Sequence, residues 1–429
     1  MTSPWRTLPL WSLATVERKV IEPTDLGDEV VHYSIPSVDA TGAGQIEESE
    51  SIKSAKFRLS GGEVLISKLN PRKSRVVSVA ASSLPIVSST EFVGLRAGDA
   101  LDSRYLAYLL QSNFVRQELD ARVQSVTRSH QRVAPEDITH LNVAVAPLAE
   151  QRRIADFLDA ETARIDGLVN AEQRVLDRLA ERRTAGVVAA VSGGEHTGRR
   201  ESTLAWLESI PEWWQEVRVG LLARMGSGHT PSRSHPEWWV DCTIPWITTG
   251  EVKQVRNDRL EVLYETREKI SELGLANSAA ELHPKGTVFL CRTAASAGYS
   301  GVMGSDMATS QDIVTWTCGP RLNPYYLLWC LRAMRPDLLG RLAMGSTHKT
   351  IYVPDLQMLR VPLPPLEEQR EIVESIRQQN SRIDSLTDKV RRQIELLMER
   401  RQALITAAVT GQFDVSTASG RNVTDGVTA

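Results

Sequence analysis

The chain has 429 residues, so it should hold roughly two or three domains. Its net charge is −3 with 24% charged residues, so its overall charge gives no sign of nucleic-acid binding. No run approaches the ~18 apolar residues of a membrane span, and the N-terminus lacks the apolar core of a signal peptide. The four cysteines, Cys242, Cys291, Cys318 and Cys330, show no CxxC spacing, which favours buried reduced thiols over disulfides or a zinc site and is typical of a cytoplasmic protein.

The first region, residues 1–146, alternates short apolar runs with Gly, Pro and Ser. Such runs predict strands joined by turns, at 30–35, 64–69, 75–80 and 91–95. Asp102 is a suitable N-cap for an amphipathic helix that extends to Val115. We therefore expect an α+β domain.

A basic cluster lies in the middle of this region, opposed within its span by Glu63. The tip at 70–73 would suit phosphate contacts if DNA is the partner, although an ordinary solvated strand face would also explain the cluster. A second basic group follows at 128–132. The two groups comprise Lys53, Lys56, Arg58, Lys68, Arg72, Lys73 and Arg75, then Arg128, His130 and Arg132.

Residues 147–193 recur without a gap at 365–411, with 20 of 47 positions identical at an offset of 218, which identifies an internal repeat. Each copy begins with proline, carries Glu-Gln in its first turn and ends at Gly193 or Gly411, and no proline interrupts it. Each copy therefore predicts one long helix.

A seven-residue apolar repeat runs along both helices, and such a repeat is typical of a coiled-coil seam. We expect the two helices to pair antiparallel. The seam residues are Leu158, Ile165 and Leu179 in the first copy and Ile376, Ile383, Val390, Leu397 and Leu404 in the second. A neighbouring stripe contains Ile154, Leu168 and Val175, then Ile372 and Leu386.

Charged residues away from the seam also repeat, although a merely solvated face would give them little reason to do so. Arg-Ile-Asp at 164–166 recurs at 382–384, and Glu-Arg-Arg at 181–183 recurs at 399–401. Two unrelated surface helices, each packed on its own domain, would not explain these identities.

The second region, residues 211–363, repeats the design of the first after a polar linker at 194–210. The segment Gly-Thr-Val-Phe-Leu at 286–290 matches 62–66, and Tyr326 matches Tyr105 at the start of a helix. Loops diverge between the halves while scaffold positions agree, as expected of two binding modules that share a fold and read different targets. Candidate contacts here are His229, Thr230, Arg233, Lys285, Arg292, Thr347, His348 and Lys349.

Catalytic motifs are not found. Asn323-Pro324 superficially matches a methyltransferase loop, but an N-cap followed by proline at the first helical position explains it. The glycines at 340 and 345 space like a phosphate loop, yet Ser346 stands where its lysine belongs. His130 and His348 have no partner at metal-ligand spacing.

Taken together, the duplicated Pro-Leu-x-Glu-Gln-Arg openings at 147–152 and 365–370, with Gly-His-Thr-Pro-Ser at 228–232 and Ile-Pro-Trp-Ile at 244–247, give a recognisable order. This order resembles the specificity subunits of type I restriction-modification systems over nearly the whole chain. The segments Gly-Ser-Thr at 345–347 and Leu-Arg-Val-Pro-Leu-Pro at 359–364 also carry the resemblance. The first half has no Gly-x-Thr-Pro loop.

The resemblance implies a non-catalytic DNA reader. Each variable region would be a target recognition domain for one half of a bipartite site in double-stranded DNA. The repeated helices would space the domains and dock two DNA methyltransferase subunits. S-adenosylmethionine would bind those partners, which methylate adenine, and a restriction/translocase subunit would use ATP and Mg²⁺.

The implied division is a target recognition domain at 1–146, a central helix at 147–193, a linker at 194–210, a second recognition domain at 211–363, a distal helix at 364–414 and a disordered tail at 415–429. DNA-contact candidates are the residues named above at 229–349, with Lys53, Lys68, Arg72, Lys73, Arg75, Arg128 and His130. Subunit-docking candidates are Glu150, Gln151, Arg152, Arg164, Asp166, Glu368, Gln369, Arg370, Arg382 and Asp384.

Geometry is compatible with this division. A helix over 148–191 is about 65 Å long at 1.5 Å per residue, while one DNA turn is roughly 34 to 36 Å, so domains at its two ends could occupy major grooves about one turn apart.

Two rival functions remain at this point: a coiled-coil scaffold that binds only proteins, which the near-neutral charge permits, and a self-sufficient methyltransferase.

Overall fold

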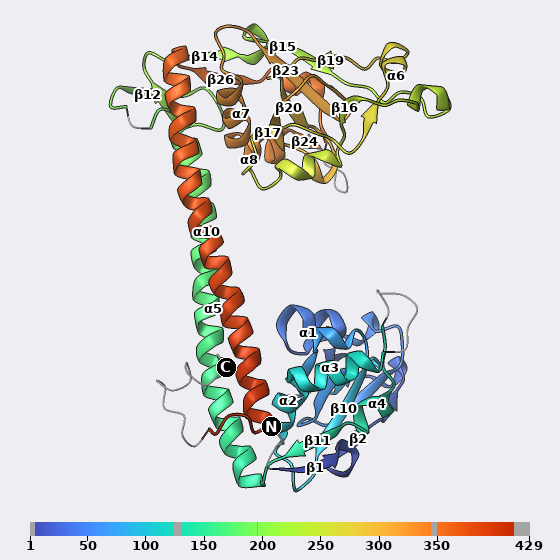
Figure 1. Ribbon diagram of the computed structural model, residues 1–429. Helices are drawn as coiled ribbons and strands as arrows, with labels where there is room; N and C mark the ends of the chain where they lie inside the picture. The colour runs from blue at the N-terminus through green and yellow to red at the C-terminus, as the bar shows by residue number, and fades with distance from the viewer. Residues whose placement is uncertain (1–4, 124–130, 195, 345–349, 416–429) are drawn as a thin grey trace. The chain divides into compact units, whose positions relative to one another are not determined.

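The computed structural model describes residues 5–123, 131–194, 196–344 and 350–415. They form two compact units, one of residues 1–173 with 392–429 and the other of residues 174–391. Two long helices, α5 (Leu148–Val191) and α10 (Leu366–Val409), contribute residues to both units (Figure 1). Each unit therefore contains one β-rich domain, the first part of one long helix and the last part of the other.

The first domain is built on two sheets. One has the strand order β2-β10-β7-β8, and the other has the order β3-β6-β9-β4-β5, with β4 and β9 parallel. Buried apolar residues of β7 and β10 pack beneath the α2 helix. The strands are β1 (Arg6–Pro9), β2 (Ala14–Glu17), β3 (Val20–Ile21), β4 (Glu29–Tyr33), β5 (Gln45–Glu48), β6 (Lys56–Leu59), β7 (Val64–Ser67), β8 (Val76–Ser78), β9 (Ile86–Ser88), β10 (Phe92–Ala97) and β11 (Asn142–Val145), and the helices are α1 (Ile35–Thr41), α2 (Ser103–Gln111), α3 (Asn113–Ala121) and α4 (Pro135–Thr139).

The helix predicted from Asp102 is present, and the Asp102 carboxylate accepts hydrogen bonds from the first-turn backbone N–H groups of α2. It does not continue to Val115. Ser112 ends α2 and caps a second helix, α3, by accepting a hydrogen bond from the backbone N–H of Val115. A serine side chain competes well for backbone groups at such a position, which explains the break.

The second domain repeats this plan, with the order β15-β23-β20-β21-β17 in one sheet and β18-β16-β22-β19 in the other. As in the first domain, one pair in the second sheet is parallel, β16 with β22. The strands are β12 (Arg199–Glu201), β13 (Ser209–Pro211), β14 (Gln215–Arg218), β15 (Ala223–Ser227), β16 (Ile244–Ile247), β17 (Val262–Leu263), β18 (Lys269–Ile270), β19 (Leu282–His283), β20 (Val288–Cys291), β21 (Ser300–Met303), β22 (Met307–Thr309), β23 (Ile313–Cys318), β24 (Ala343–Met344), β25 (Thr350–Ile351) and β26 (Arg360–Leu363), and the helices are α6 (Glu272–Ala276), α7 (Pro324–Ala333), α8 (Arg335–Asp337) and α9 (Val353–Gln357).

Asn323 caps α7 with Pro324 in its first turn, so the structural interpretation of this motif is confirmed. An antiparallel strand pair returns each domain to its long helix: β1 with β11 just before α5, and β14 with β26 just before α10. The two domains are thus versions of one fold, as the sequence repeat predicts.

Residues 196–210 of the linker segment are folded. Its strand β12 pairs with β13, and Leu204, Leu207 and Ile210 are buried against Trp214. The polar appearance of the segment therefore conceals a small apolar cluster.

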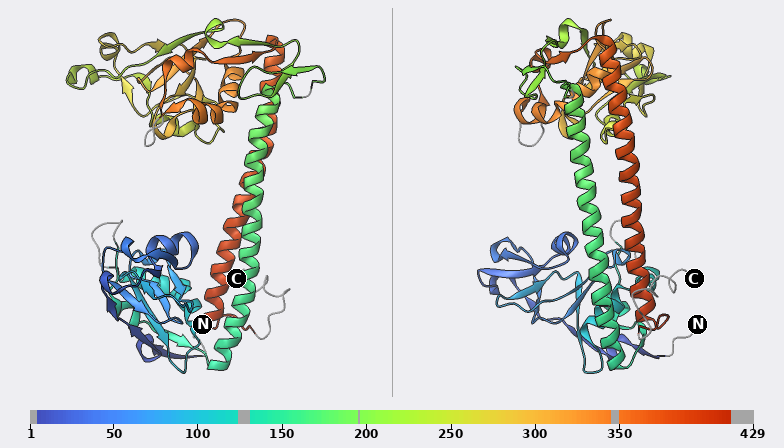
Figure 2. Two further views of the ribbon diagram at one scale, coloured as in Figure 1. Left: turned by 180° about the vertical axis from the view of Figure 1, so that it is seen from behind. Right: turned by 90° about the vertical axis from the view of Figure 1, so that its left-hand side faces the viewer.

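The two long helices pair antiparallel in each unit (Figure 2). In the second unit Arg183 bonds to Asp384, and Gly186 faces the Gln379 side chain. Residue numbers therefore increase along α5 in the direction in which they decrease along α10, as in an antiparallel pair. The predicted α+β fold with two long antiparallel helices is confirmed.

The expected seam is buried at its ends: Leu158, Ile165, Ile376, Ile383 and Leu404 are each 5% exposed or less. The neighbouring stripe is only partly used, because Ile154 is buried whereas Leu168, Val175 and Leu386 are 42–49% exposed. An α-helix drifts by roughly 20° per heptad from a strict seven-residue repeat, so a second stripe turns away from the partner helix.

A tyrosine in each domain holds the end of the long helix that comes from the other repeat. The Tyr105 hydroxyl lies 3.2 Å from the Val409 carbonyl oxygen, and the Tyr326 hydroxyl lies 3.4 Å from that of Val191 and 3.0 Å from that of Pro362. Val191 and Val409 occupy the same position in the two repeats, so the internal symmetry extends to single hydrogen bonds.

Among the described residues, no helix is both long and apolar enough to cross a bilayer.

Candidate nucleic-acid interface

A tight turn presents the basic tip of the first domain. It is a single 3₁₀ turn, Pro71–Lys73, flanked by Asn70 and Ser74, which both have left-handed backbone angles (φ 51° and 47°). The Asn70 backbone N–H donates to the Gln131 carbonyl at 2.7 Å, which ties the turn to the segment at 131–133. The turn is therefore anchored at its base, and the side chains of Arg72 and Lys73 are exposed at its tip.

Not every predicted basic residue belongs to this tip. Lys68 lies at its base, where it is half-buried, whereas Lys53 is exposed in a separate turn and donates to the Glu50 carbonyl. Arg132, beside the turn, pairs with Glu91 at 2.9 Å. Arg128 and His130 lie outside the described residues.

Arg75 is a correction to the predicted set. Its side chain is 7% exposed, and the guanidinium donates to both carboxylate oxygens of Asp39, at 2.5 and 2.8 Å, and to the Leu69 carbonyl at 3.1 Å. These hydrogen bonds lower the pKa of Asp39. Proximity in sequence placed Arg75 with its basic neighbours, but its side chain points inward and joins α1 to the turn, so it cannot reach a phosphate.

The second domain places Arg292 where the first places Lys68. Each residue directly follows the corresponding strand, β20 or β7, and each backbone N–H donates to the carbonyl of an acidic residue: Arg292 to Asp312 at 2.9 Å and Lys68 to Glu91 at 2.8 Å. The same fold position therefore carries a basic residue in both domains.

This position adjoins the same two segments in both domains. The residue after Lys68 forms a bridge with Arg132, and the residue after Arg292 forms a bridge with Thr350. Arg132 and Thr350 are themselves equivalent in the repeat, at the offset of 218. Thr347, His348 and Lys349, which precede Thr350, lie outside the described residues.

The Gly-His-Thr-Pro-Ser loop of the second domain packs against the end of β22. A Cβ at Gly228 would lie 1.9 Å from the Thr309 carbonyl oxygen, so only glycine allows this approach. The His229 backbone N–H donates to the same carbonyl at 3.0 Å, and the Thr230 hydroxyl donates to Oε1 of Gln311 at 2.6 Å. Arg292 joins the group from the other side, because its Nε donates to the Gln311 carbonyl at 3.0 Å.

The structure thus brings Thr230 and Arg292 together around Gln311, a residue that sequence reasoning missed, while His229 contacts Thr309. Gln311 is an uncharged loop residue and belongs to no recognisable sequence motif. Its segment could have been located by aligning β23, which it precedes, with β10 of the first domain. Arg233 is separate, 4.4 Å above the Trp239 ring, and Lys285 lies at the opposite end of β20 from Arg292.

Gln151 and Gln369, predicted as docking residues, are corrections. Both are fully buried. The Gln369 side chain accepts from the Asn323 backbone N–H at 2.8 Å and donates to the carbonyls of Arg321 and Pro364 at 3.0 and 2.9 Å. Gln151 makes the equivalent bonds to Asp102, Ala100 and Ala146. Each glutamine fastens a long helix to its own domain, which leaves no surface for a partner.

Asp166 and Asp384 are also engaged within the chain. Arg401 Nε donates to Asp166 at 2.9 Å, and Arg183 bonds to Asp384, so the repeated Arg-Ile-Asp and Glu-Arg-Arg segments pair with each other across the helices. Glu368 accepts hydrogen bonds from His196 and Trp214. The remaining docking candidates are half-exposed or exposed on the helices: Glu150, Arg152, Arg164, Arg370 and Arg382.

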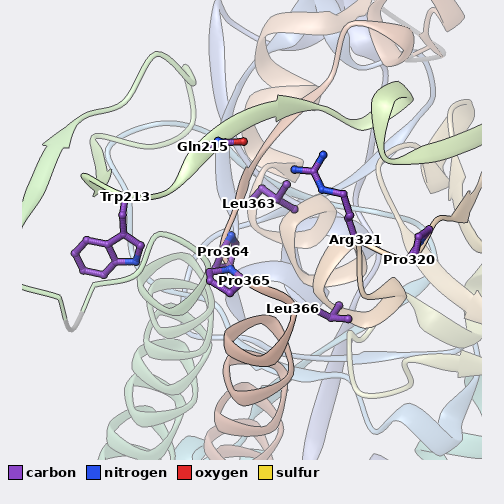
Figure 3. A pocket seen from close by; sticks show the side chains of 8 residues that line it. All are labelled: Trp213, Gln215, Pro320, Arg321, Leu363, Pro364, Pro365 and Leu366. Carbon is purple, nitrogen blue, oxygen red and sulfur yellow. The ribbon is translucent and has the colours of Figure 1, made fainter.

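The pocket in Figure 3 lies where the second domain meets the start of α10 and has a volume of about 330 Å³. Trp213 lines one side and Arg321 the other, with Leu363 and Pro364 between them (Figure 3). Of the predicted DNA-contact residues that the structure describes, none lines this pocket.

Nucleophilic and metal chemistry finds little support. No group of three or more His, Cys, Asp or Glu side chains among the described residues could hold a metal ion. The four cysteines form no disulfide, and burial raises the pKa of Cys291 to about 11 and that of Cys318 to about 12. These thiols are therefore protonated and unreactive near neutral pH.

Comparison with known proteins gives a consistent result. A family model described as the type I restriction modification DNA specificity domain matches residues 211–396. A Methanocaldococcus jannaschii protein assigned as the MjaX type I restriction enzyme specificity subunit is 22% identical over 404 residues, 89% of this chain and 85% of its own.

Two solved structures have a similar fold. A chain from a study of complex assembly and conformational transition in the type I R-M system gives a TM-score of 0.74 at 21% identity, covering 96% of this chain and 100% of its own. The HsdS subunit from Thermoanaerobacter tengcongensis gives a TM-score of 0.53 at 21% identity, covering 96% of this chain and 98% of its own.

Proposed function

Because this chain belongs to the DNA specificity subunits of type I restriction-modification systems, we propose that each of its domains reads one half of a bipartite DNA site through the surface around Lys68 or Arg292. The chain is the non-catalytic part of such a system. The observation that carries the proposal is the equivalence of these two basic residues. Each directly follows a strand, donates its backbone N–H to the carbonyl of an acidic residue, and precedes a residue that forms a β-bridge.

Within each surface, basic side chains would fix the register on phosphates while neighbouring polar groups contact base edges. In the first domain the phosphate contacts would come from Lys68, Arg72 and Lys73. In the second domain Arg292 would take this role, with His229 and Thr230 beside it. Lys53, Arg233 and Lys285 are exposed but stand apart from these surfaces, so we assign them no direct part.

We further propose that the long helices dock two DNA methyltransferase subunits at repeated exposed positions. Leu168 and Leu386 occupy the same position in the two repeats, are 46% and 49% exposed, and take no part in the buried seam. Arg164 and Arg382 precede them by one helical turn and are also exposed. The repeated glutamines and aspartates, Gln151 with Gln369 and Asp166 with Asp384, make contacts inside the chain, whereas the repeated leucines lie outside the buried seam.

The chemistry would then reside on the partners, which would bind S-adenosylmethionine and, where a restriction/translocase subunit is present, ATP and Mg²⁺. The family membership disfavours the two rival functions, a purely protein-binding scaffold and a self-sufficient methyltransferase.

A domain exchange tests the division of labour. Residues 1–146 are replaced by the equivalent domain of another family member, and the methylated sites are read by methylome sequencing of cells that carry the methyltransferase subunit. We expect one half of the recognised sequence to change and the other to persist. The matched control exchanges residues 211–363 and should alter the opposite half; a change in both halves after either exchange would contradict the proposal.

A further inference from the structure

Gln311 has the geometry of a side chain that reads a base. It is exposed in the short connection between β22 and β23. The connection is held rigidly, because the Ser310 backbone N–H donates to the Ile247 carbonyl at 2.9 Å and the Thr293 hydroxyl donates to the Asp312 carboxylate at 2.8 Å. A contact residue on a firmly held segment loses little conformational entropy when it binds.

The amide of Gln311 is also oriented. The Thr230 hydroxyl donates to Oε1 at 2.6 Å, which fixes the oxygen toward the Gly-His-Thr-Pro-Ser loop. No described residue bonds to Nε2, so both of its hydrogens remain available for a ligand, and Oε1 retains one of its two lone pairs. The loop reaches this place because Gly228 lets its backbone approach Thr309.

The neighbourhood supplies the other half of a DNA contact. Arg292 bonds to the backbone of Gln311 from the opposite side, so a basic residue proposed for phosphate contact is next to an oriented amide. In the major groove, an amide that offers one donor and one acceptor pairs with N7 and the N6 amino group of adenine. Thymine, guanine and cytosine do not present this combination on one base.

We propose that Gln311 is a specificity-determining residue that reads an adenine in the half-site of the second domain, with Thr230 as its positioning residue. This inference rests on the proposed function of the second domain as a DNA reader. The ligand class is a purine base edge in double-stranded DNA, and the discriminating contact is a bidentate hydrogen bond.

The test uses the full chain in complex with the methyltransferase subunit of its own system. Site preference is measured by methylome sequencing and by competition binding to oligonucleotides that vary one position at a time. For Gln311→Ala we expect discrimination for adenine to fall roughly 5- to 150-fold at one position of the second half-site, with the first half-site unchanged. Thr230→Val, which keeps the shape and removes the hydroxyl, should give a smaller loss at the same position.

Arg292→Ala is the matched control. It should weaken binding to all sequences alike and lower the slope of log affinity against log salt by about one, without changing the preferred base. Gln311→Ala should leave that slope unchanged. If Gln311→Ala keeps the full preference at every position, the inference is wrong even when the second domain reads DNA. If exchange of residues 211–363 leaves the second half-site unaltered, the proposed function itself fails.

Discussion

Single buried amides decide how each domain is attached to its helix. Gln151 and Gln369 follow the same Pro-Leu-x-Glu opening and make the same three hydrogen bonds, two to residues that precede a domain helix and one to a carbonyl just before the long helix. Because the amide donates two bonds and accepts one, neither glutamate nor leucine could replace it. The repetition of glutamine in the two copies therefore reflects internal structure and not partner binding.

We expect Gln369→Leu to destabilise the second unit. The change leaves the Asn323 N–H and two carbonyl groups without partners, at a cost of about 1–3 kcal/mol for each group that stays buried. Hydrogen exchange should show lost protection near 321–327 and 364–372, with residues 100–106 as before. Gln151→Leu is the reciprocal control and should act only on the first unit; equal loss in both units would show that the two attachments are not independent.

At the scale of elements, the two long helices carry three kinds of repeated residue. Seam residues such as Ile165 and Ile383 are buried. Asp166 and Asp384 pair with arginines of the opposite helix. Leu168 and Leu386 are exposed at matched positions, and our proposal assigns them to the docking of the methyltransferase subunits.

Leu168→Asp and Leu386→Asp should each weaken binding of one methyltransferase subunit, and the double variant should lose both. Burying an unpaired carboxylate at an interface is unfavourable, so we expect at least a tenfold loss of affinity for each subunit, or about 1.4 kcal/mol. Mass photometry or analytical ultracentrifugation reads the stoichiometry. Met398→Asp, at a 60% exposed position outside this pair, is the control; an unchanged two-to-one complex with the double variant would refute the docking surface.

At the scale of the whole molecule, α5 and α10 each extend over 44 residues and enter both units. In a bipartite reader, such helices would set the separation of the two half-sites. Our proposal therefore ties DNA spacer length to helix length, at 1.5 Å per residue.

Insertion of four residues into both helices, at facing positions of the seam, should lengthen the preferred spacer. Four residues add about 6 Å, which corresponds to at most ~2 base pairs. Methylome sequencing of cells that carry the variant measures the spacer directly. A control that replaces four seam-distant residues without changing length should keep the original spacer, and an unaltered spacer in the insertion variant would argue against a fixed-length separator.

The sequence alone determined the repeat, the fold class, the two long helices and the resemblance to the specificity subunits. These features rest on periodicity and on identities at a constant offset, which a linear chain displays fully. It could not determine which charged residues are free to act. Arg75 and Lys68 have the same chemistry and lie in one cluster, yet the first is buried against Asp39 and the second lies at the base of an exposed turn.

Only the tertiary structure decided that the Gln151 and Gln369 side chains are buried hydrogen-bond partners, that Leu168 and Leu386 of the neighbouring stripe are exposed, and that Gln311 lies beside Arg292. The physical reason is that side-chain direction and long-range hydrogen bonds depend on how distant segments meet. Gln311 and Thr230 are 81 residues apart, and a local pattern carries no information about such a contact.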